Sequence, residues 1–313
     1  MNFYPVYITT LNRYTHFKRC VESLARNTHA DRTELVIGLD YPPEEKYVEG
    51  YLKIKSYIPT IKGFKKVTVF ERTENYGPSK NSLDLRDYCF RHYDAVILTE
   101  DDNEFSPCFL DYMNKALEAY ATDPHVYSVS AYIERNYYGK LRQQLMFSYD
   151  NNAWGLGLWK SKEQNSKLYT KDYFKKIILS FSQSYKVFRV SPGIFSMLVD
   201  MVKLNQSWGD VERSARNIIN GTYQLRPSFS LVRNTGYDGT GIHCGISDPD
   251  DLAHQIISEE LFFNYNFCEV ADVNTPAIRK QLSLHCIPHG FIRRQKFFLV
   301  LVQKYLKLRF CLK

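Results

Sequence analysis

Three consecutive carboxylates, Glu100, Asp101 and Asp102, are the residues of this sequence most suited to chemistry. They directly follow the apolar run 95–99, which predicts that they lie at the end of a buried strand. Carboxylates crowded into a small volume repel one another unless a cation is present, and oxygen ligands favour Mg²⁺ or Mn²⁺, which often bridge to substrate phosphates. The alternative is a solvated acidic turn that precedes a helix. The strand-end position favours the metal site.

The elements that must position this cluster alternate between strand-like and helix-like patterns. Strands are expected at residues 5–10, 34–39, 66–71, 95–99 and 126–130, and helices at 15–25, 43–57, 78–88 and 106–120. This alternation implies right-handed crossovers and a mainly parallel α/β sheet covered on both faces, in which ligands bind beyond the carboxyl ends of the strands. Arg13, Asp40 and the carboxylate cluster all follow strand ends, so we expect one ligand site at that edge.

The pattern becomes irregular after residue 131. Tyr, Asn and Gly gather in residues 132–140 and 149–159, which we expect to form loops or lids. Helices are expected near 171–182 and 211–219. The sequence contains no internal repeat or low-complexity linker, so any second domain is built onto the first.

The charge of the chain is concentrated at one end. The 313 residues include 41 Lys and Arg against 34 Asp and Glu, a formal charge of +7, and 44% are hydrophobic, which excludes wholesale disorder. Residues 289–313 contain seven basic and no acidic residues, so the first 288 residues are balanced. A nucleic-acid-binding protein would more often spread its basic residues over the folded surface, and we therefore expect no nucleic-acid partner.

The basic residues of this C-terminal segment alternate with apolar ones at helical spacing. Arg293, Lys296, Lys304 and Lys307 share one arc, and Phe291, Phe298, Val302 and Leu306 lie opposite. The pattern is typical of a basic amphipathic helix on an anionic membrane surface. The alternative is a C-terminal helix that packs on the core of the protein itself, because Arg294, Arg309 and Lys313 do not fit the arc.

The cysteines and the N-terminal segment indicate a compartment. The seven cysteines are odd in number and form no Cys-x-x-Cys pair, which indicates reduced thiols rather than disulfides or a zinc site. The N-terminal residues resemble no signal peptide, and no apolar stretch reaches the roughly 18 residues of a membrane span. We therefore expect a cytoplasmic protein, peripheral on the inner face of the membrane.

Several short motifs appear in an order that resembles a known family. Residues 5–13 (PVYITTLNR), 34–40 (ELVIGLD), 75–81 (NYGPSKN) and 96–113 (VILTEDDNEFSPCFLDYM) look like the nucleotide-sugar half of a GT-A glycosyltransferase. The segment from EDD to SPCF is similar to that of the Golgi N-acetylglucosaminyltransferases that begin N-glycan branching, and bacterial family-2-like glycosyltransferases are also similar. The resemblance continues through WGLGLW (154–159), SWGD (207–210), RPS (226–228) and residues 236–243, and so covers roughly residues 3–245.

The resemblance implies a GT-A, Rossmann-like fold with a metal-dependent donor site. Residues 1–131 would form the nucleotide-sugar half, 132–245 the acceptor-binding and catalytic half, and 246–313 a C-terminal helical extension. Its motifs imply that Asp102 and His243 bind Mn²⁺ or Mg²⁺ on a donor diphosphate. The donor-binding set it implies consists of Thr10, Arg13, Asp40, Asn75, Lys80, Glu100, Asp101, Trp154 and Gly155.

Individual roles follow from the same resemblance. Asp40 would accept a hydrogen bond from uracil, Arg13 would lie near the base or the diphosphate, and Glu100 and Asp101 would contact ribose or steady the site. The family histidine of the third nucleotide contact has no clear match, and Asn75 or Lys80 stands in its place. Gly155 and Gly157 would let a loop close over the donor. Trp154, Trp159 and Trp208 are candidates for stacking on sugars, although we expect Trp159 to belong to the core.

Asp210 matches the catalytic base of the family. In an inverting transfer, a carboxylate takes the proton from the acceptor hydroxyl as that oxygen attacks the anomeric carbon. Asp210 could instead cap a helix, and Asp200 is the rival base. The family has a second acid before its base, and here that position is Gly209.

We therefore expect a metal-dependent, inverting glycosyltransferase that takes a UDP-sugar and acts on a glycan or lipid-linked oligosaccharide in surface polysaccharide synthesis. A nucleotidyltransferase is the rival enzyme, but such enzymes normally have a Gly-rich basic loop after the first strand, and residues 9–13 do not form one. A non-catalytic module that binds sugars or membranes is the other alternative.

Overall fold

The structure, a computed structural model, describes residues 1–134, 144–166, 171–241, 248 and 251–272, together with residues 299, 302, 303, 305, 306 and 310 of the C-terminal segment. The expected His243, and most of the amphipathic pattern at the C-terminus, lie outside these residues.

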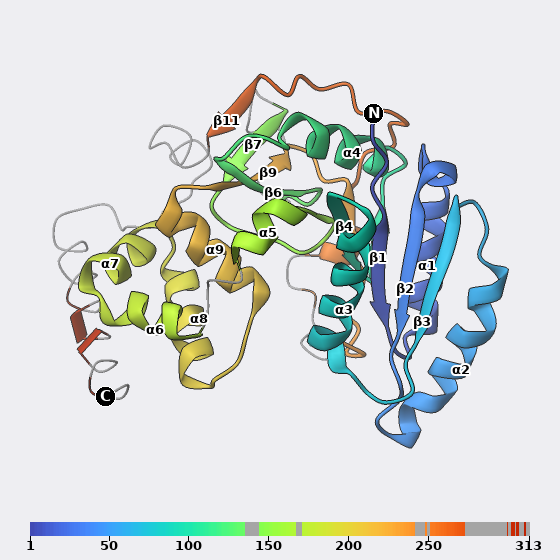
Figure 1. The fold of residues 1–313 in the computed structure, drawn as a ribbon, viewed down its shortest axis with the longest axis horizontal. Helices are drawn as coiled ribbons and strands as arrows, with labels where there is room; N and C mark the ends of the chain where they lie inside the picture. Colours follow the sequence, from blue (N-terminus) through green and yellow to red (C-terminus); the bar gives the residue numbers. More distant parts are fainter. Residues whose placement is uncertain are drawn as a thin grey trace.

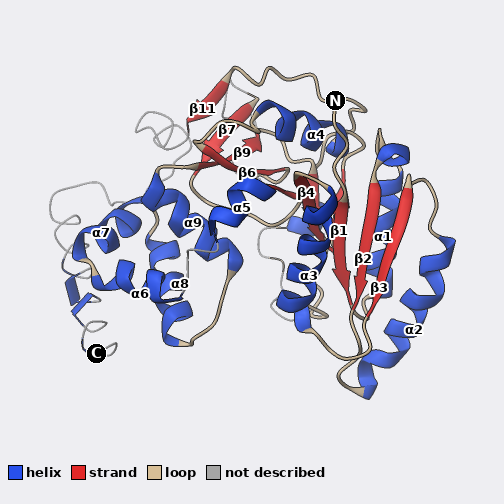
Figure 2. Ribbon diagram, in the orientation of Figure 1, coloured by secondary structure: helices blue, strands red, loops and turns tan. Residues whose placement is uncertain are grey.

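A nine-stranded sheet forms the centre of the fold, as Figures 1 and 2 show. Its order is β11-β7-β9-β6-β8-β4-β1-β2-β3. Strands β1 to β4 are parallel, and β6 and β9 run in the same direction. Strand β8 is antiparallel to β4 and β6, and β7 is antiparallel to β9 but parallel to β11. The bounds are β1 Val6–Thr10, β2 Glu34–Leu39, β3 Lys66–Glu71, β4 Ala95–Glu100, β6 Val126–Ser130, β7 Leu145–Ser148, β8 Leu156–Trp159, β9 Tyr223–Pro227 and β11 Val270–Asp272. The predicted α/β class and mainly parallel sheet are confirmed.

Helices cover both faces of this sheet. Because successive side chains of a strand point to opposite faces, Val6 and Ile8 of β1 pack in the core with α1, α2 and α4, whereas Tyr7 packs in the core beneath α3. The bounds of the helices are α1 Tyr14–Ala25, α2 Val48–Tyr57, α3 Gly77–His92, α4 Phe109–Ala119, α5 Lys160–Ser166, α6 Lys171–Leu179, α7 Phe181–Val190, α8 Pro192–Lys203 and α9 Gly209–Asn220.

Helices α6 to α9 form a separate helical lobe beside the sheet, at the lower left of Figure 1. Its own core joins Phe174 of α6, Val187 of α7, Leu198 of α8 and Ala215 of α9. The amphipathic pattern of α9 places its apolar side in this core, including Val211 of the first turn. The lobe therefore supplies a second, independently packed support for the residues at the start of α9.

The strands predicted for the first 130 residues are confirmed to within one residue. The described strands that were not predicted are β5 (Asn103–Phe105), β7, β8, β9, β10 (Val232–Asn234) and β11. Residues 149–159 were expected to form a loop, and β8 occupies the last four of them, between β4 and β6. Its glycine looked like a loop signal, yet a Cβ on Gly157 would lie 2.9 Å from Met113 Cε of α4. The glycine permits close packing of strand against helix, so the expectation of a mobile loop at Gly157 is wrong.

The structure also tests the expectations for Trp159, for the helix at 171–182 and for the cysteines. Trp159 is confirmed as a core residue, because its side chain is buried and its Nε1 donates to Leu117 O at 3.0 Å. The single helix expected at 171–182 is two helices, which break at Ser180. Among the described residues, Cys20, Cys89, Cys108 and Cys268 are free thiols. No helix in the described part of the chain is long and apolar enough to span a membrane.

Candidate active site

The carboxyl ends of β1, β2 and β4 meet at one edge of the sheet. Thr10 ends β1, Asp40 follows β2, and Glu100 ends β4 immediately before Asp101 and Asp102. Since β1 lies between β2 and β4 and is parallel to both, these residues emerge at the same edge. The structure therefore brings together the strand-end residues that the sequence singles out, as the rule for parallel sheets requires.

Arg13 binds two of the three clustered carboxylates. Its Nη1 donates to Asp102 Oδ2 at 2.8 Å, and its Nη2 forms an ion pair with Asp101. Thr10 Oγ1 also donates to Asp101 Oδ2 at 2.8 Å. Burial raises the pKa of Asp101, and the Arg13 charge opposes that shift. Arg13 thus reaches the cluster itself, at the position where positive charge is needed.

Asp102 is held from the other side by a small second sheet, in which β5 (Asn103–Phe105) pairs with β10 (Val232–Asn234). Asn234 Nδ2 donates to Asp102 Oδ1 at 2.7 Å, and Thr235 N donates to Asp102 O at 2.8 Å. Gly236 follows directly, and a Cβ there would lie 2.2 Å from Asp102 Oδ2. Sequence reasoning missed Asn234 because the β5–β10 pairing spans about 130 residues of chain and leaves no local pattern.

Gly236→Ala is expected to lower sugar transfer by about 10- to 100-fold, because the added methyl group must displace the Asp102 carboxylate, and small misplacements of catalytic groups cost about this much. Steady-state kinetics would measure the loss. Gly193→Ala is the matched control, since its Cβ meets nothing closer than 3.9 Å in α8, and it should keep full activity. Normal turnover in Gly236→Ala would show that the position of Asp102 is unimportant.

Glu100 points away from the other two carboxylates and toward a tryptophan. Trp154 Nε1 donates to Glu100 Oε2 at 3.1 Å, and the Trp154 ring packs edge-on against Tyr132, with 4.6 Å between centroids. Gly155 is next to this tryptophan and has φ +67°, where a Cβ would strain the backbone and approach the Phe109 ring at 2.7 Å. Gly155 thus fixes where Trp154 stands beside the cluster.

The charges that act on Glu100 include one from the helical lobe, that of Asp210. Desolvation by the surrounding protein is the largest cause that raises the pKa of Glu100, followed by the charges of Asp102, Asp210 and Asp101. Asp210 lies more than 100 residues away in sequence and comes from α9. Its carboxylate is therefore close enough to the strand-end cluster for the two sites to share one electrostatic environment.

Asp210 lies in the first turn of α9, whose N-cap is Trp208, so the expectation that Asp210 caps this helix is wrong. Desolvation raises the pKa of Asp210, and Arg213, Arg226 and a hydrogen bond from the backbone N–H of Ala153 oppose the rise. A raised pKa suits a carboxylate that must accept a proton near neutral pH. The rival base, Asp200, is exposed on α8.

Asp40 anchors a separate polar group at the end of β2. Its Oδ1 accepts hydrogen bonds from Tyr41 N at 2.9 Å and Tyr76 N at 2.8 Å, and its Oδ2 accepts one from Asn75 Nδ2 at 3.3 Å. Lys80 is exposed, and its Nζ lies 3.5 Å from the centre of the Tyr76 ring. Asn75 is therefore in contact with Asp40, whereas Lys80 reaches this group only through Tyr76.

The cluster fits a divalent cation through Asp102. The three carboxylates do not all converge as expected: Asp101 and Asp102 share the Arg13 guanidinium, whereas Glu100 turns to Trp154. Each oxygen of Asp102 accepts one described hydrogen bond, which leaves a lone pair on each. Among the described residues, no three His, Cys, Asp or Glu side chains form a metal cage. A cation here would take Asp102 and complete its shell with water and phosphate oxygens.

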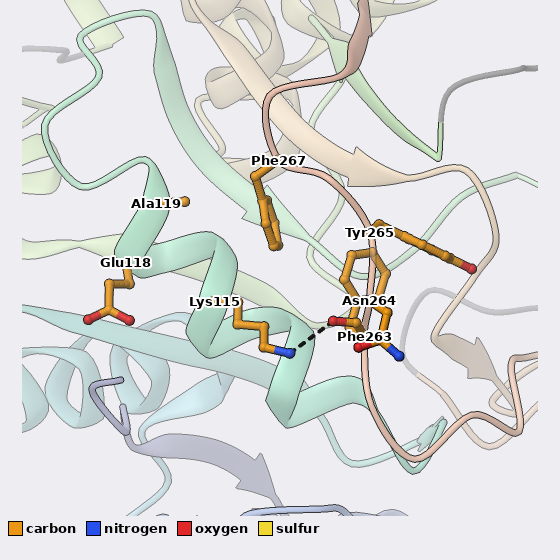
Figure 3. A pocket seen from close by; sticks show the side chains of 7 residues that line it. All are labelled: Lys115, Glu118, Ala119, Phe263, Asn264, Tyr265 and Phe267. Carbon is orange, nitrogen blue, oxygen red and sulfur yellow. Dashed lines mark hydrogen bonds between the residues drawn. The ribbon is translucent and has the colours of Figure 1, made fainter.

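A shallow hollow lies elsewhere on the surface, between α4 and residues 263–267 (Figure 3). Lys115 Nζ donates to Phe263 O at 2.9 Å across its floor. Its lining residues are Lys115, Glu118, Ala119, Phe263, Asn264, Tyr265 and Phe267. None of them belongs to the strand-end cluster, so the hollow is separate from the candidate active site.

Solved structures of three glycosyltransferases are similar to this chain at low sequence identity. The mannosyltransferase PcManGT from Pyrobaculum calidifontis, in complex with GDP-Man and Mn²⁺, is 12% identical with a TM-score of 0.37, over 69% of this chain and 74% of that one. TarS from S. aureus is 13% identical with a TM-score of 0.38, over 68% of this chain and 41% of TarS. Mouse xyloside xylosyltransferase 1 is 11% identical with a TM-score of 0.38, over 71% and 83% of the two chains.

The sequence itself gives the assignment. No curated protein has significant similarity to the chain. Residues 6–192, more than half of the chain, match the family described as Glycosyl transferase family 2, and the match contains β1, β2, β4 and the carboxylate cluster at their ends. Family membership and the observed sheet therefore agree on a nucleotide-sugar enzyme, and this chain belongs to glycosyl transferase family 2.

Proposed function

We propose that this glycosyltransferase is an inverting, metal-dependent enzyme that takes a UDP-sugar and uses Asp210 as its base. The observation that carries the proposal is a chain of contacts: the Asp210 carboxylate accepts a hydrogen bond from Ala153 N, and Trp154, the next residue, donates to Glu100 Oε2 at 3.1 Å. Donor-side and base-side residues come from different parts of the chain, the sheet edge and the start of α9, as a reaction between two bound sugars needs. The family match ends at residue 192, so the role of Asp210 rests on its position.

Asp40 supports uracil as the base of the donor. The two backbone N–H groups of Tyr41 and Tyr76 occupy both lone pairs of Oδ1, and only Oδ2 has capacity left. Guanine presents two adjacent donor groups on its pairing edge, whereas uracil presents a single N–H between two carbonyl groups. One available oxygen matches one donor. Asn75 Nδ2 donates both to Asp40 Oδ2 and to Tyr41 O at 2.7 Å, and so holds this carboxylate against the backbone of the loop.

The residues at the sheet edge would hold the donor diphosphate. A divalent cation bound at Asp102 would offset the negative charge that develops on the leaving diphosphate. Arg13 keeps Asp101 and Asp102 in place and carries positive charge on the same side. Trp154, fixed by Glu100 and Tyr132, presents an indole beside the cluster where a sugar ring can stack.

The base would act from α9. Asp210 would accept the proton of the acceptor hydroxyl while that oxygen attacks the anomeric carbon and the bond to the diphosphate breaks. Because attack comes from the side opposite the leaving group, the configuration at the anomeric carbon inverts. The division into a nucleotide-sugar half (1–131), an acceptor half (132–245) and a C-terminal extension (246–313) belongs to the same proposal.

The acceptor would be a glycan or a lipid-linked oligosaccharide at an anionic membrane surface, reached through the basic C-terminal segment. Leu306 and Phe310 are exposed, while Tyr305 packs edge-on against Phe181 of α7 and donates to Leu179 O at 2.7 Å. Tyr305 would thus tie the segment to the helical lobe and leave apolar side chains for lipid. Sedimentation of the full chain with vesicles should show binding to anionic but not to zwitterionic lipid, and equal binding would contradict this part.

Calorimetry with UDP tests the donor and the metal together. With Mn²⁺, UDP should bind at least about tenfold more tightly than with EDTA, and more tightly than GDP or CDP, since one bidentate or charge-assisted contact is worth about this much. Release of UDP from a panel of UDP-sugars would then identify the sugar. Equal affinity in EDTA would contradict the metal, and tighter binding of GDP would contradict the assignment of the base.

A further inference from the structure

Arg213 lies one turn after Asp210 in α9, on the same side of the helix, because residues three apart are neighbours on a helix surface. Its side chain turns back toward the start of the helix: a Cβ on Gly209 would lie 2.9 Å from Arg213 Nη1. Gly209 therefore leaves the space that this guanidinium occupies beside the first turn. Any larger residue at 209 would push the Arg213 side chain away from Asp210.

The other end of the guanidinium is anchored on a buried carboxylate. Arg213 Nη2 lies 3.6 Å from Oε2 of Glu163 in α5, which is 5% exposed. Glu163 also accepts from Arg86 Nη1 of α3 at 3.1 Å and from the Tyr127 hydroxyl of β6. These charges hold the pKa of Glu163 below its usual range, with Arg213 the largest opposing influence on its desolvation. Arg213 thus connects the helical lobe to the sheet.

We infer that Arg213 is the positioning residue of the transfer reaction: braced by Glu163, it fixes the first turn of α9 and holds positive charge beside the Asp210 carboxylate. The inference rests on the proposed role of Asp210 as the base. It also gives a reason for Gly209, whose missing side chain leaves room for the guanidinium.

The charges around Asp210 fit this role. Besides Arg213, the groups that act on it are Glu100 at the end of β4, whose own pKa is raised to about 8, the Arg226 guanidinium of β9 and the backbone N–H of Ala153. Arg213 is the largest of the influences that lower the pKa of Asp210 against desolvation. Without Arg213, the pKa of the Asp210 carboxylate would rise further, and its side chain would lose its fixed place.

Arg213→Gln and Arg213→Lys test the inference, with Arg86→Gln as the matched control. Both arginines pair with Glu163, and their side chains are similarly enclosed, with 18% and 13% exposed, but Arg86 lies on α3. We expect Arg213→Gln to lower kcat at least about tenfold, as misplaced catalytic groups do, with KM for the donor and the affinity for UDP unchanged. The acid limb of the kcat profile should move to higher pH. Arg213→Lys should restore part of kcat and return the limb toward its original pH.

The inference is overturned if Arg213→Gln keeps normal kcat, or if Arg86→Gln lowers kcat equally, because the loss would then come from the Glu163 network. Should Arg213→Gln fail to fold, Arg213→Lys still tests the inference. It should shift the acid limb of the kcat profile and lower kcat without changing KM, and an unchanged limb with normal kcat would overturn the inference. In an Asp210→Asn background, Arg213→Gln should cause no further loss, and an added loss of tenfold would contradict the link. If Asp210→Asn itself retains turnover, the proposed base fails, independently of Arg213.

Discussion

Replacing Asp210 with Asn is expected to remove sugar transfer while sparing the binding of the donor. An amide has the size of the carboxylate but cannot take the proton of the acceptor hydroxyl, and general base catalysis contributes about 10²- to 10⁴-fold to kcat. Asp210 belongs to the first turn of α9, a different element from the strand ends that would hold the nucleotide. Turnover by product release and UDP affinity by calorimetry, measured on the same preparation, would separate the two effects.

Asp200→Asn is the matched control for this experiment, since it removes an exposed carboxylate from α8 of the same lobe and should leave kcat unchanged. The wild-type enzyme should also lose activity as the pH falls through the raised pKa of Asp210, because only the ionised carboxylate accepts a proton. That loss should therefore begin above the range of an ordinary aspartate. Full turnover in Asp210→Asn, or loss of turnover in Asp200→Asn, would show that Asp210 is not the base.

Asp102→Asn is expected to abolish the dependence of UDP binding on Mn²⁺. The carboxylate is buried among Arg13, Asn234 and Gly236, each of which fixes its position, and it keeps a lone pair on each oxygen for a cation. Removing a negative ligand charge should weaken the metal-dependent affinity by about 100-fold or more, the scale on which a coordinating carboxylate acts in such sites. Titration of UDP with Mn²⁺ and with EDTA would measure it.

Asp101→Asn offers the comparison at the adjacent position. Asp101 is equally enclosed and shares Arg13, but it turns to Thr10 rather than to the place of the cation. This variant should be less stable than the wild type, since a buried ion pair is broken, yet its remaining UDP binding should still respond to Mn²⁺. If UDP binding no longer responded to Mn²⁺ in Asp101→Asn but still did in Asp102→Asn, then Asp101 and not Asp102 would be the metal ligand.

Much of the sheet could be predicted because its strands are buried on both faces. Residues 34–39 read as one apolar run, and every residue of β2 is buried, so a hydrophobic segment of this length between helical patterns has few other structures open to it. Strand β8 has the same burial but contains Gly157 and follows Gly155, and a single sequence cannot tell a glycine that bends a loop from one that lets a helix approach. Only the contact with Met113 decides.

The candidate site also has a part that could be predicted from the sequence and a part that could not. Thr10, Asp40 and the Glu100–Asp102 cluster were predictable as neighbours, because a parallel sheet brings all its carboxyl ends to one edge. Asn234 and Gly236 were not predictable as contacts of Asp102, since β10 pairs with β5 across about 130 residues. The closure of such a long loop leaves no local trace in the sequence.

The sequence by itself determined the α/β sheet, the edge at which the chemistry gathers and the carboxylates that stand there, because these depend on local hydrophobic pattern and on the direction of strands. The tertiary structure alone decided how the three carboxylates divide, with Asp101 on Thr10, Asp102 on Asn234 and Glu100 on Trp154. It also decided that the charge of Asp210 acts on Glu100, whereas Asp200 lies exposed on α8, since the core of the helical lobe holds both helices. Charges act through space, and the distance between them is set by the fold rather than by their separation along the chain.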